Sequence, residues 1–474
     1  MAKKNTEGTQ PTLPTQTAGL SALISDIHEI IEDKARSMEL TFSEMNQSTL
    51  VKNSISTGVL SIDLAIGGGY APGRYCHIFG DTGTCKSTLC YHTIKEAILR
   101  DMIAIVMDYE SSVDPSYLEH IGIRLDEACG FRNKKGDWEI APKVKYATWE
   151  NGDIGFNYMA SLLRILPNKI SKKDLKDDVE RHFLVANDFR YIDSWASIND
   201  GLKKGKIIEV EDGTPQIIFF IDSLRAMLPK SIQDVPDTEM PALHAKMLSR
   251  GFQQIKSLLG SKKCNLIATN NITVNPMARF QNPETETGGS AVKVYPDFKM
   301  KMIANRSEGK MIEEQHYTGK GLDRYIMGRG KIVKNKFGPS FREVPFRLWL
   351  DELADPGRGF CPVFDTYNFL ESCLLIDKID KETFGIKLEG FNDRKYTWME
   401  FKKFILVEDE KEVLRDKCKE MLRQGEAQKF YYDFVKNQSI KKKKPAKGMG
   451  TSSSGVASED EIPELEIEET TLEI

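Results

Sequence analysis

Residues 80–88 read GDTGTCKST and stand between an apolar run and a helical pattern, an order that limits the possible folds more than any other feature of the chain. The run RYCHIFG is typical of a buried strand, and STLCYHTIKEAILR is typical of a helix. A glycine-rich turn at such a junction directs backbone N–H groups and a helix N-terminus toward a phosphate. The sequence therefore predicts an α/β fold with a phosphate-binding loop.

The loop departs from the usual pattern at one position. Gly80, Lys86 and Ser87 match G-x-x-x-x-G-K-[ST], whereas Cys85 stands where a second glycine is usual. We expect its Cβ to strain the turn, with Gly83 absorbing part of the strain. In this interpretation Lys86 reaches the β- and γ-phosphates and the Ser87 hydroxyl ligates Mg²⁺. The residues expected to line the nucleotide here are Gly80, Asp81, Thr82, Gly83, Thr84, Cys85, Lys86, Ser87 and Thr88.

Two carboxylates stand at the ends of other predicted strands. Asp222 ends the run IIFFID, as an acid that assists Mg²⁺ binding beside a phosphate loop should. Glu110 ends MIAIVMDYE, at the sheet edge where α/β proteins bind ligands, and could orient an attacking water. In isolation the first would more often be a structural cap and the second a solvated surface residue. The loop upstream favours the catalytic interpretation of both.

Between about Ser54 and Leu350, strand-like runs alternate with helical ones, which predicts a core with a mostly parallel sheet. The connection at about 125–213 is too long for an ordinary loop, so we expect an inserted subdomain there. Its expected helices are GFNYMASLLRIL (155–166) and SKKDLKDDVERHF (171–183). A small α+β domain at 351–440, with a helix at 408–424, is expected to follow. The strands expected in the core are 74–80, 102–110, 215–223, 264–271, 298–304 and 328–336.

The two ends of the chain differ from the core. Residues 1–17 are polar and rich in Pro and Thr, which predicts disorder. Residues 18–53 contain an amphipathic helix at 20–38, which either packs on its own core or serves as an oligomerisation arm that docks on a neighbouring subunit. Residues 441–474 form a basic and then acidic low-complexity tail, for which disorder is also expected.

The composition restricts the class of protein. The 474 residues are 40% hydrophobic and 29% charged with a formal net charge of −4, which argues against a uniformly basic nucleic-acid binder. The eight cysteines include no C-x-x-C pair, which indicates reduced thiols in a cytosolic chain. No apolar run approaches the ~20 residues that span a bilayer, and the first residues lack the apolar segment of a signal peptide. We therefore expect a cytoplasmic protein with no membrane partner.

Four segments resemble, in the same order, the RecA and UvsX family of strand-exchange recombinases. They are STGVLSIDLAIGGGYAPGRYCHIFG, MDYESSVDPSYLEHIGI, NPETETGGSAVKVYP and KIVKNKFGP. The resemblance covers about 54–350 without the insertion, and Cys85 places the chain on the phage UvsX side. It implies a RecA-like phosphate-loop ATPase core that uses ATP and Mg²⁺ and forms helical filaments on single-stranded DNA. It further implies pairing and strand exchange with homologous duplex DNA in recombination, repair and recombination-dependent replication. A single-stranded-DNA-binding protein and a mediator are implied as further partners, with the host cytoplasm as location.

The resemblance also implies roles around the nucleotide. Ser87 and Asp222 would hold the metal ion, and Asp114 and Tyr117 would contact adenine. Asn271 stands where bacterial members have a glutamine that senses the γ-phosphate, and its shorter amide reaches less far. The residues given catalytic roles are Lys86, Glu110, Asn271 and the pair Lys334 and Lys336, which would reach the γ-phosphate bound by a neighbouring subunit.

Two loops would bind DNA. The first is expected at 231–246, where only the surroundings of Met240 and Lys246 match well. The second is expected at 272–287, which is too rich in Gly, Pro and Thr to form a stable element. It offers Arg279 for phosphates, and Met277 and Phe280 as apolar wedges between bases. Gly288, Gly289 and Ser290 would meet DNA phosphates at a helix N-terminus.

Two alternatives remain open at this point. A hexameric helicase or motor ATPase would share the phosphate loop but lacks a counterpart of NPETETGG. A DNA-binding protein switched by ATP without efficient hydrolysis would follow if Cys85 had ended turnover.

Overall fold

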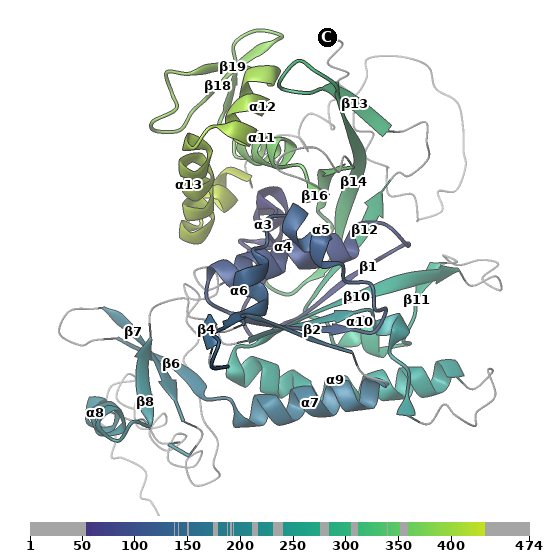
Figure 1. Cartoon of the computed structure of the whole chain (residues 1–474), viewed down its shortest axis with the longest axis vertical. Coiled ribbons are helices and arrows are strands. Elements are labelled where there is room, and N and C mark those ends of the chain that lie inside the picture. The colour runs from purple at the N-terminus through teal and green to yellow at the C-terminus, as the bar shows by residue number, and fades with distance from the viewer. Residues whose placement is uncertain are drawn as a thin grey trace, which may run out of the picture.

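The fold is built on one large sheet with helices on both faces (Figure 1). The computed structural model describes residues 54–136, 138–140, 142–148, 151–173, 179–186, 188, 189, 192, 194–210, 217–230, 240–274, 284–304, 311–338, 340–350 and 359–431. The arm expected at 18–53 and the tail expected at 441–474 lie outside these residues.

The central sheet confirms the predicted α/β fold class. From β12 to β5 its strands run parallel, while β14, β15 and β16 are antiparallel to their neighbours. All six expected core strands are present. In spatial order the strands are β16 (Gly359–Phe360), β15 (Glu343–Trp349), β14 (Leu322–Asn335), β12 (Phe298–Ala304), β1 (Tyr75–Gly80), β10 (Asn265–Val274), β9 (Ile217–Asp222), β2 (Ile103–Asp108) and β5 (Val144–Ala147).

Two short strands extend this sheet: β11 (Glu284–Glu286) pairs with β10, and β13 (Met311–Gln315) pairs with β14. The remaining short elements are α5 (Pro115–His120), α6 (Leu125–Cys129), β3 (Phe131–Arg132), β4 (Trp138–Ile140), η1 (Leu224–Ala226) and α10 (Ala291–Val294).

Helices bury both faces of the sheet, which is why its strands read as continuous apolar runs rather than alternating ones. On one face, β9 contributes Ile218 and Phe220 to a core shared with α3 (Leu60–Ile66) and α4 (Lys86–Leu99). On the other face, Phe219 and Ile221 pack with α7 (Gly152–Ile165) and α9 (Met240–Lys262). Figure 1 shows these two helix layers on opposite sides of the sheet.

A separate small unit leaves the core after α7. It contains β6 (Asn168–Lys173), β7 (Glu180–Val185), α8 (Trp195–Lys203) and β8 (Ile207–Val210), with its own buried cluster of Phe183, Val185, Ile198 and Ile207.

This unit corrects two expectations. The helix expected at 171–183 is wrong, because β6 and β7 pair as antiparallel strands there. Phe183 and Val185, two positions apart on β7, both point into the buried cluster, as side chains on one face of a strand do. The expected insertion at 125–213 begins too early, since β5 joins the central sheet and α7 packs on α9. The helix expected at 155–166 is confirmed as α7.

The C-terminal α+β unit packs against the core through α3 and the β13–β14 hairpin. It comprises α11 (Pro362–Ser372), β17 (Ile376–Lys378), β18 (Thr383–Ile386), β19 (Lys395–Thr397), α12 (Trp398–Val407) and α13 (Glu410–Gln424). The expected helix at 408–424 is thus present as α13. No helix in the described parts of the chain has the length and apolarity needed to cross a membrane.

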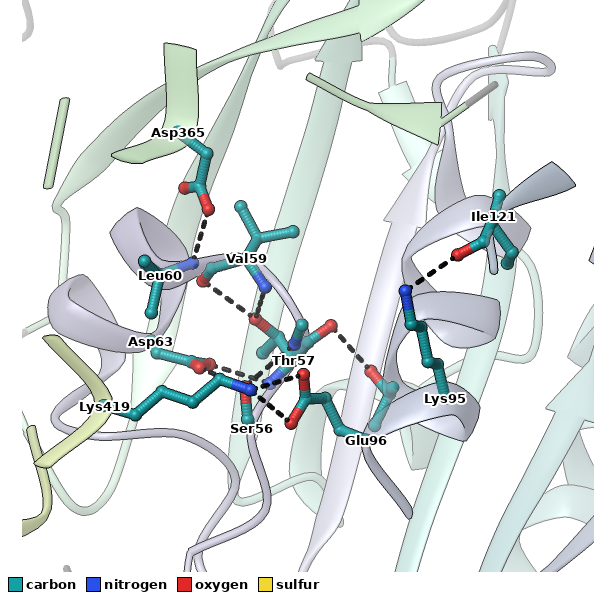
Figure 2. A network of polar contacts seen from close by, with 12 residues as sticks. Ser56, Thr57, Val59, Leu60, Asp63, Lys95, Glu96, Ile121, Asp365 and Lys419 are labelled. Carbon is teal, nitrogen blue, oxygen red and sulfur yellow. Dashed lines mark hydrogen bonds and ion pairs between the residues drawn. The ribbon is translucent and has the colours of Figure 1, made fainter. Parts of the chain in front are cut away.

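Polar contacts fix this unit to the core (Figure 2). The Asp365 carboxylate accepts hydrogen bonds from the backbone N–H groups of Leu60 (2.8 Å) and Ser61 (2.9 Å), which satisfies the first turn of α3. Lys419 of α13 pairs with Glu96 of α4 at 3.0 Å. The helix that follows the phosphate loop is therefore tied directly to the C-terminal unit.

Candidate functional site

The loop between β1 and α4 requires special residues at two positions. A Cβ on Gly80 would lie 2.3 Å from the Met302 carbonyl oxygen, so only glycine fits there. Cys85, the last loop residue, has φ +67° and lies in the left-handed region, where a side chain costs about 1–2 kcal/mol. Its thiol is buried in the core beneath α4. The conformation explains why glycine is the usual residue at this place.

The Lys86 side chain folds back onto the phosphate loop. Its ammonium donates hydrogen bonds to the backbone carbonyls of Gly80 (3.1 Å) and Asp81 (2.6 Å). Burial lowers the pKa of Lys86, and the carboxylates of Asp222 and Glu110 act in the opposite direction. The lysine therefore lies on the loop backbone and faces two acids.

Asp222 lies beside the loop at the end of β9. Its Oδ1 accepts a hydrogen bond from Thr269 at 2.6 Å, while its buried Oδ2 has no hydrogen-bond partner among the described residues. Burial raises the pKa of Asp222, and its hydrogen-bond interactions with Ser87 and Thr269 act against that. A buried carboxylate oxygen that lacks a partner and lies near a hydroxyl fits a metal ion or its bound water.

The donor set around Asp222 also limits what it can bind. No group of three or more His, Cys, Asp or Glu side chains that could hold a metal ion occurs among the residues described. Mg²⁺ takes one or two protein ligands together with phosphate oxygens in such sites. Ser87 and Asp222 therefore fit an ion that is held jointly with a nucleotide.

Glu110 is positioned by an acid that the sequence analysis missed. Asp108, fully buried at the end of β2, accepts hydrogen bonds from the backbone N–H groups of Glu110 (3.0 Å), Ser112 (2.8 Å) and Val113 (3.0 Å). The Glu110 carboxylate in turn accepts one from the Ser223 hydroxyl at 2.5 Å. The sequence did contain a signal for Asp108, because this acid ends an apolar run two residues before the exposed Glu110.

The expected adenine contacts lie over the helix after the loop. The Tyr117 hydroxyl lies 3.0 Å from the Thr88 hydroxyl of α4, and its ring meets Tyr91 edge to face. Asp114 caps α5 by accepting a hydrogen bond from the Ser116 backbone at 2.9 Å. Hydrogen bonds from the Ser116 side chain and then its backbone lower the pKa of Asp114. Tyr117 is thus connected to α4, whereas Asp114 caps α5, the helix that carries Tyr117.

Strand register places Asn271 next to the phosphate loop. In the parallel pair β1–β10, Asn271 is the partner of Gly80, and in β2–β9 Asp108 is the partner of Asp222. Because the carboxyl ends of these strands share one edge, the groups expected to act on phosphate lie together.

The expected second DNA loop leaves from the same edge. Both ends of the range 272–287 are strands that pair with each other, which corrects the expectation that this range forms no stable element. Strand β10 continues past the sheet and pairs with β11, so the two form a ribbon (Figure 1). Asn270, another residue that the sequence analysis missed, donates a hydrogen bond to the Thr287 carbonyl at 2.8 Å. Met277, Arg279 and Phe280 lie outside the described residues.

The end of this loop approaches α9. Gly288 has φ +110°, and a Cβ on it would lie 2.6 Å from Leu248; Gly289 has φ +68°, with Ala245 at 2.9 Å. Gly289 and Ser290 are exposed, as is Lys246 of the same helix. Met240 begins α9, and its side chain lies outside the described residues, as does most of the expected first loop.

Lys334 and Lys336 lie far from the phosphate loop of their own chain. Lys334, near the end of β14, donates to the carbonyls of Lys293 (3.2 Å) and Val294 (3.0 Å). Lys336 lies just past that strand and pairs with Asp297 at 3.0 Å. Asp297 hydrogen-bonds Tyr75, the first residue of β1, whereas the phosphate loop follows the last. Tyr75 and Gly80 are five positions apart along the strand, which corresponds to about 17 Å.

Comparison with known proteins agrees with this architecture. The RecA N-terminal domain family matches residues 22–169 and 200–353 of the chain, so the gap between the two matched ranges falls within the small β6–β8 unit. Protein RecA of Agrobacterium fabrum is 25% identical over 336 residues, which cover 68% of this chain and 72% of that protein. Protein RecA of Brucella canis is 26% identical over 335 residues, covering 70% and 72%. The chain belongs to the RecA family.

Proposed function

We propose that this protein is an ATP-dependent homologous recombinase that assembles as a helical filament on single-stranded DNA and exchanges strands with a homologous duplex. Membership of the RecA family supports a recombinase-type ATPase that binds DNA. The observation that carries the proposal is the register of β1 and β10. It sets Gly80 of the phosphate loop beside Asn271, at the base of the ribbon that leads to the DNA loop.

The proposed hydrolysis uses groups that already face one another. Lys86 would leave the loop carbonyls to contact the β- and γ-phosphates, and Ser87 and Asp222 would hold Mg²⁺. Mg²⁺, when bound, neutralises charge on the phosphate oxygens. Glu110, oriented by Asp108 and Ser223, accepts a proton from the attacking water. Tyr117 contacts the adenine.

Assembly would complete the site. Lys336 is held beside Tyr75, the end of β1 that lies about 17 Å of strand from the phosphate loop. Lys334 is two strands away from β1, in register with Lys299 and His77. In this proposal both lysines therefore act on the nucleotide of a neighbouring subunit. There they would stabilise the charge that develops on the γ-phosphate, as an arginine finger does. Hydrolysis would then require the filament.

We further propose that the protein is of the phage UvsX type and works in the cytoplasm of a host cell, with a single-stranded-DNA-binding protein and a mediator. Cys85 in the place of a loop glycine supports this assignment. The same residue favours a second candidate, an ATP-switched DNA-binding protein with little turnover, because its left-handed backbone strains the loop.

ATP hydrolysis with and without single-stranded DNA, followed by electron microscopy of the ATP-bound protein on that DNA, tests these candidates. The recombinase predicts DNA-stimulated hydrolysis and helical filaments, both lost in Lys86→Ala. Filaments without hydrolysis would favour the ATP-switched protein. Closed rings, or unchanged turnover in Lys86→Ala, would refute the proposal.

A further inference from the structure

A buried ion pair lies beneath the exit of the expected second DNA loop. The Lys299 ammonium of β12 contacts both carboxylate oxygens of Glu286, at 2.7 and 2.9 Å. Their side chains are only 5% and 12% exposed. Glu286 is the last residue of β11 and directly precedes Thr287 and Gly288. The pair therefore joins the end of the DNA-loop ribbon to a core strand.

The same pair touches the strand that leads into the phosphate loop. Lys299 is the register partner of His77 on β1, and its ammonium lies 4.9 Å from the centroid of the Phe79 ring. The ring of His77 meets that of Phe79 edge to face, and its Nε2 lies 3.6 Å from the Glu286 carboxylate. Burial, together with the nearby Lys299, lowers the pKa of His77 well below its usual range, so the imidazole is neutral. Lys299 is thus the cation that balances Glu286 here.

A buried ion pair commits its partners to one position. If β11 moved away, Lys299 would remain in a nearly dry site with its carboxylate partner removed, which is strongly unfavourable. Other contacts hold the two residues that follow Glu286 in the chain. Asn270 donates a hydrogen bond to the Thr287 carbonyl, and Gly288 packs on Leu248. The exit of the loop is therefore held against β10, β12 and α9, next to the strand that ends in Gly80.

We propose that Glu286 and Lys299 are positioning residues that hold the exit of the DNA loop against the phosphate-loop strand, so that DNA binding and ATP hydrolysis are coupled. This inference rests on the proposed function. Asn271 is expected to connect the nucleotide site to the DNA loop. The Glu286–Lys299 ion pair would be a second connection between these two sites.

The test compares single and double variants with a matched control. Glu286→Gln and Lys299→Met each break the pair, and the double variant removes both charges at once. Lys402→Met breaks another buried pair away from the loop: Lys402 of α12 is 1% exposed and contacts Asp323 of β14 at 2.5 Å. Lys299→Arg keeps the charge. The readouts are melting temperature, binding of a fluorescent ATP analogue without DNA, and hydrolysis against poly(dT) concentration.

We expect each single variant to raise the poly(dT) concentration for half-maximal hydrolysis about ten-fold, with ATP-analogue affinity unchanged within about two-fold. The double variant should regain most of the lost melting temperature, because no unpaired charge remains, yet keep the raised poly(dT) requirement. Lys402→Met should lose melting temperature and keep the wild-type poly(dT) requirement, and Lys299→Arg should resemble wild type.

The proposal is overturned if the single variants keep the wild-type poly(dT) requirement. It is also overturned if the double variant recovers both the melting temperature and the poly(dT) requirement of wild type. An equal rise of the poly(dT) requirement in Lys402→Met would overturn it as well. In each case wild type is stimulated by poly(dT), and the proposed function stands. A wild-type chain that poly(dT) does not stimulate would remove both proposals.

Discussion

The Lys336 ammonium lies 3.0 Å from a carboxylate oxygen of Asp297, beside the first residue of β1 and at the opposite end of that strand from the phosphate loop. Asp297 is buried and also pairs with Lys256, and these two lysines keep its pKa low despite burial. Release of Lys336 therefore leaves Asp297 with a partner, which makes the lysine available to a neighbouring subunit.

We expect Lys336→Ala to bind nucleotide normally and to lose DNA-stimulated hydrolysis, since its own site keeps Lys86, Asp222 and Glu110. Mixing it with Glu110→Ala should restore part of the activity, because one type of mixed interface has both intact groups. Lys331→Ala, on β14 just before Lys336 and paired with Glu343 at 3.3 Å, is the matched control and should stay active. Equal mixing with single-stranded DNA that yields no activity above either variant would rule out action between subunits.

Cys85→Gly tests the strained turn. Glycine relieves the left-handed backbone but loses the buried thiol and gains chain entropy when unfolded, so the free energy of unfolding should change by less than about 1 kcal/mol. Turnover should be kept or raised. Cys85→Val, whose branched Cβ tolerates φ +67° poorly, should lose more than about 1 kcal/mol. Urea unfolding and ATP titration measure both; a folded Cys85→Gly protein that binds no nucleotide would contradict our interpretation of the loop.

Asp63 makes stability depend on pH. It is fully buried, and burial raises its pKa to about 7, with hydrogen bonds from Ser56 and Thr57 acting against the rise (Figure 2). Because the folded state binds this proton more tightly than the unfolded state, stability falls as the pH rises from about 4 to about 7.

Asp63→Asn mimics the protonated form and should remove this contribution. The stability of the variant relative to wild type should increase between pH 5 and pH 8, by about 2–3 kcal/mol. Asp101→Asn, at a side chain that is 81% exposed, should track wild type throughout. Urea unfolding at both pH values provides the measurement, and a constant difference between Asp63→Asn and wild type would argue against the raised pKa.

The acidic tail should restrain DNA binding. Residues 458–474 carry eight carboxylate side chains and no Lys or Arg, so they can compete with DNA phosphates for basic surface. Truncation after Lys447 should tighten duplex binding, most strongly at low salt. Equal affinities of the full and truncated chains across a salt series would leave the tail without this role.

Much of the nucleotide site was predictable from local sequence. The phosphate loop is a contiguous strand–turn–helix motif, and strands buried on both faces read as apolar runs, so Gly80, Lys86 and Ser87 and the strand ends at Glu110 and Asp222 could be located. The short polar unit after α7 was predicted less well. Its strand β7 buries His182, Phe183 and Val185 but not Leu184, so it is not a continuous apolar run, and its charged neighbours resemble an exposed helix.

The fold class, the phosphate loop and the candidate acids could be read from local patterns, because each depends on residues that are neighbours in the chain. Which distant groups meet depends instead on the three-dimensional arrangement of the strands. The register of β1 against β10 brings Asn271 to Gly80, and the pairing of β11 with β10 carries Glu286 to Lys299. Likewise, because β14 runs antiparallel to β12, Lys336 lies at the end of the strands that is opposite the phosphate loop. Strand order and direction arise from packing across the whole core, which no local pattern encodes.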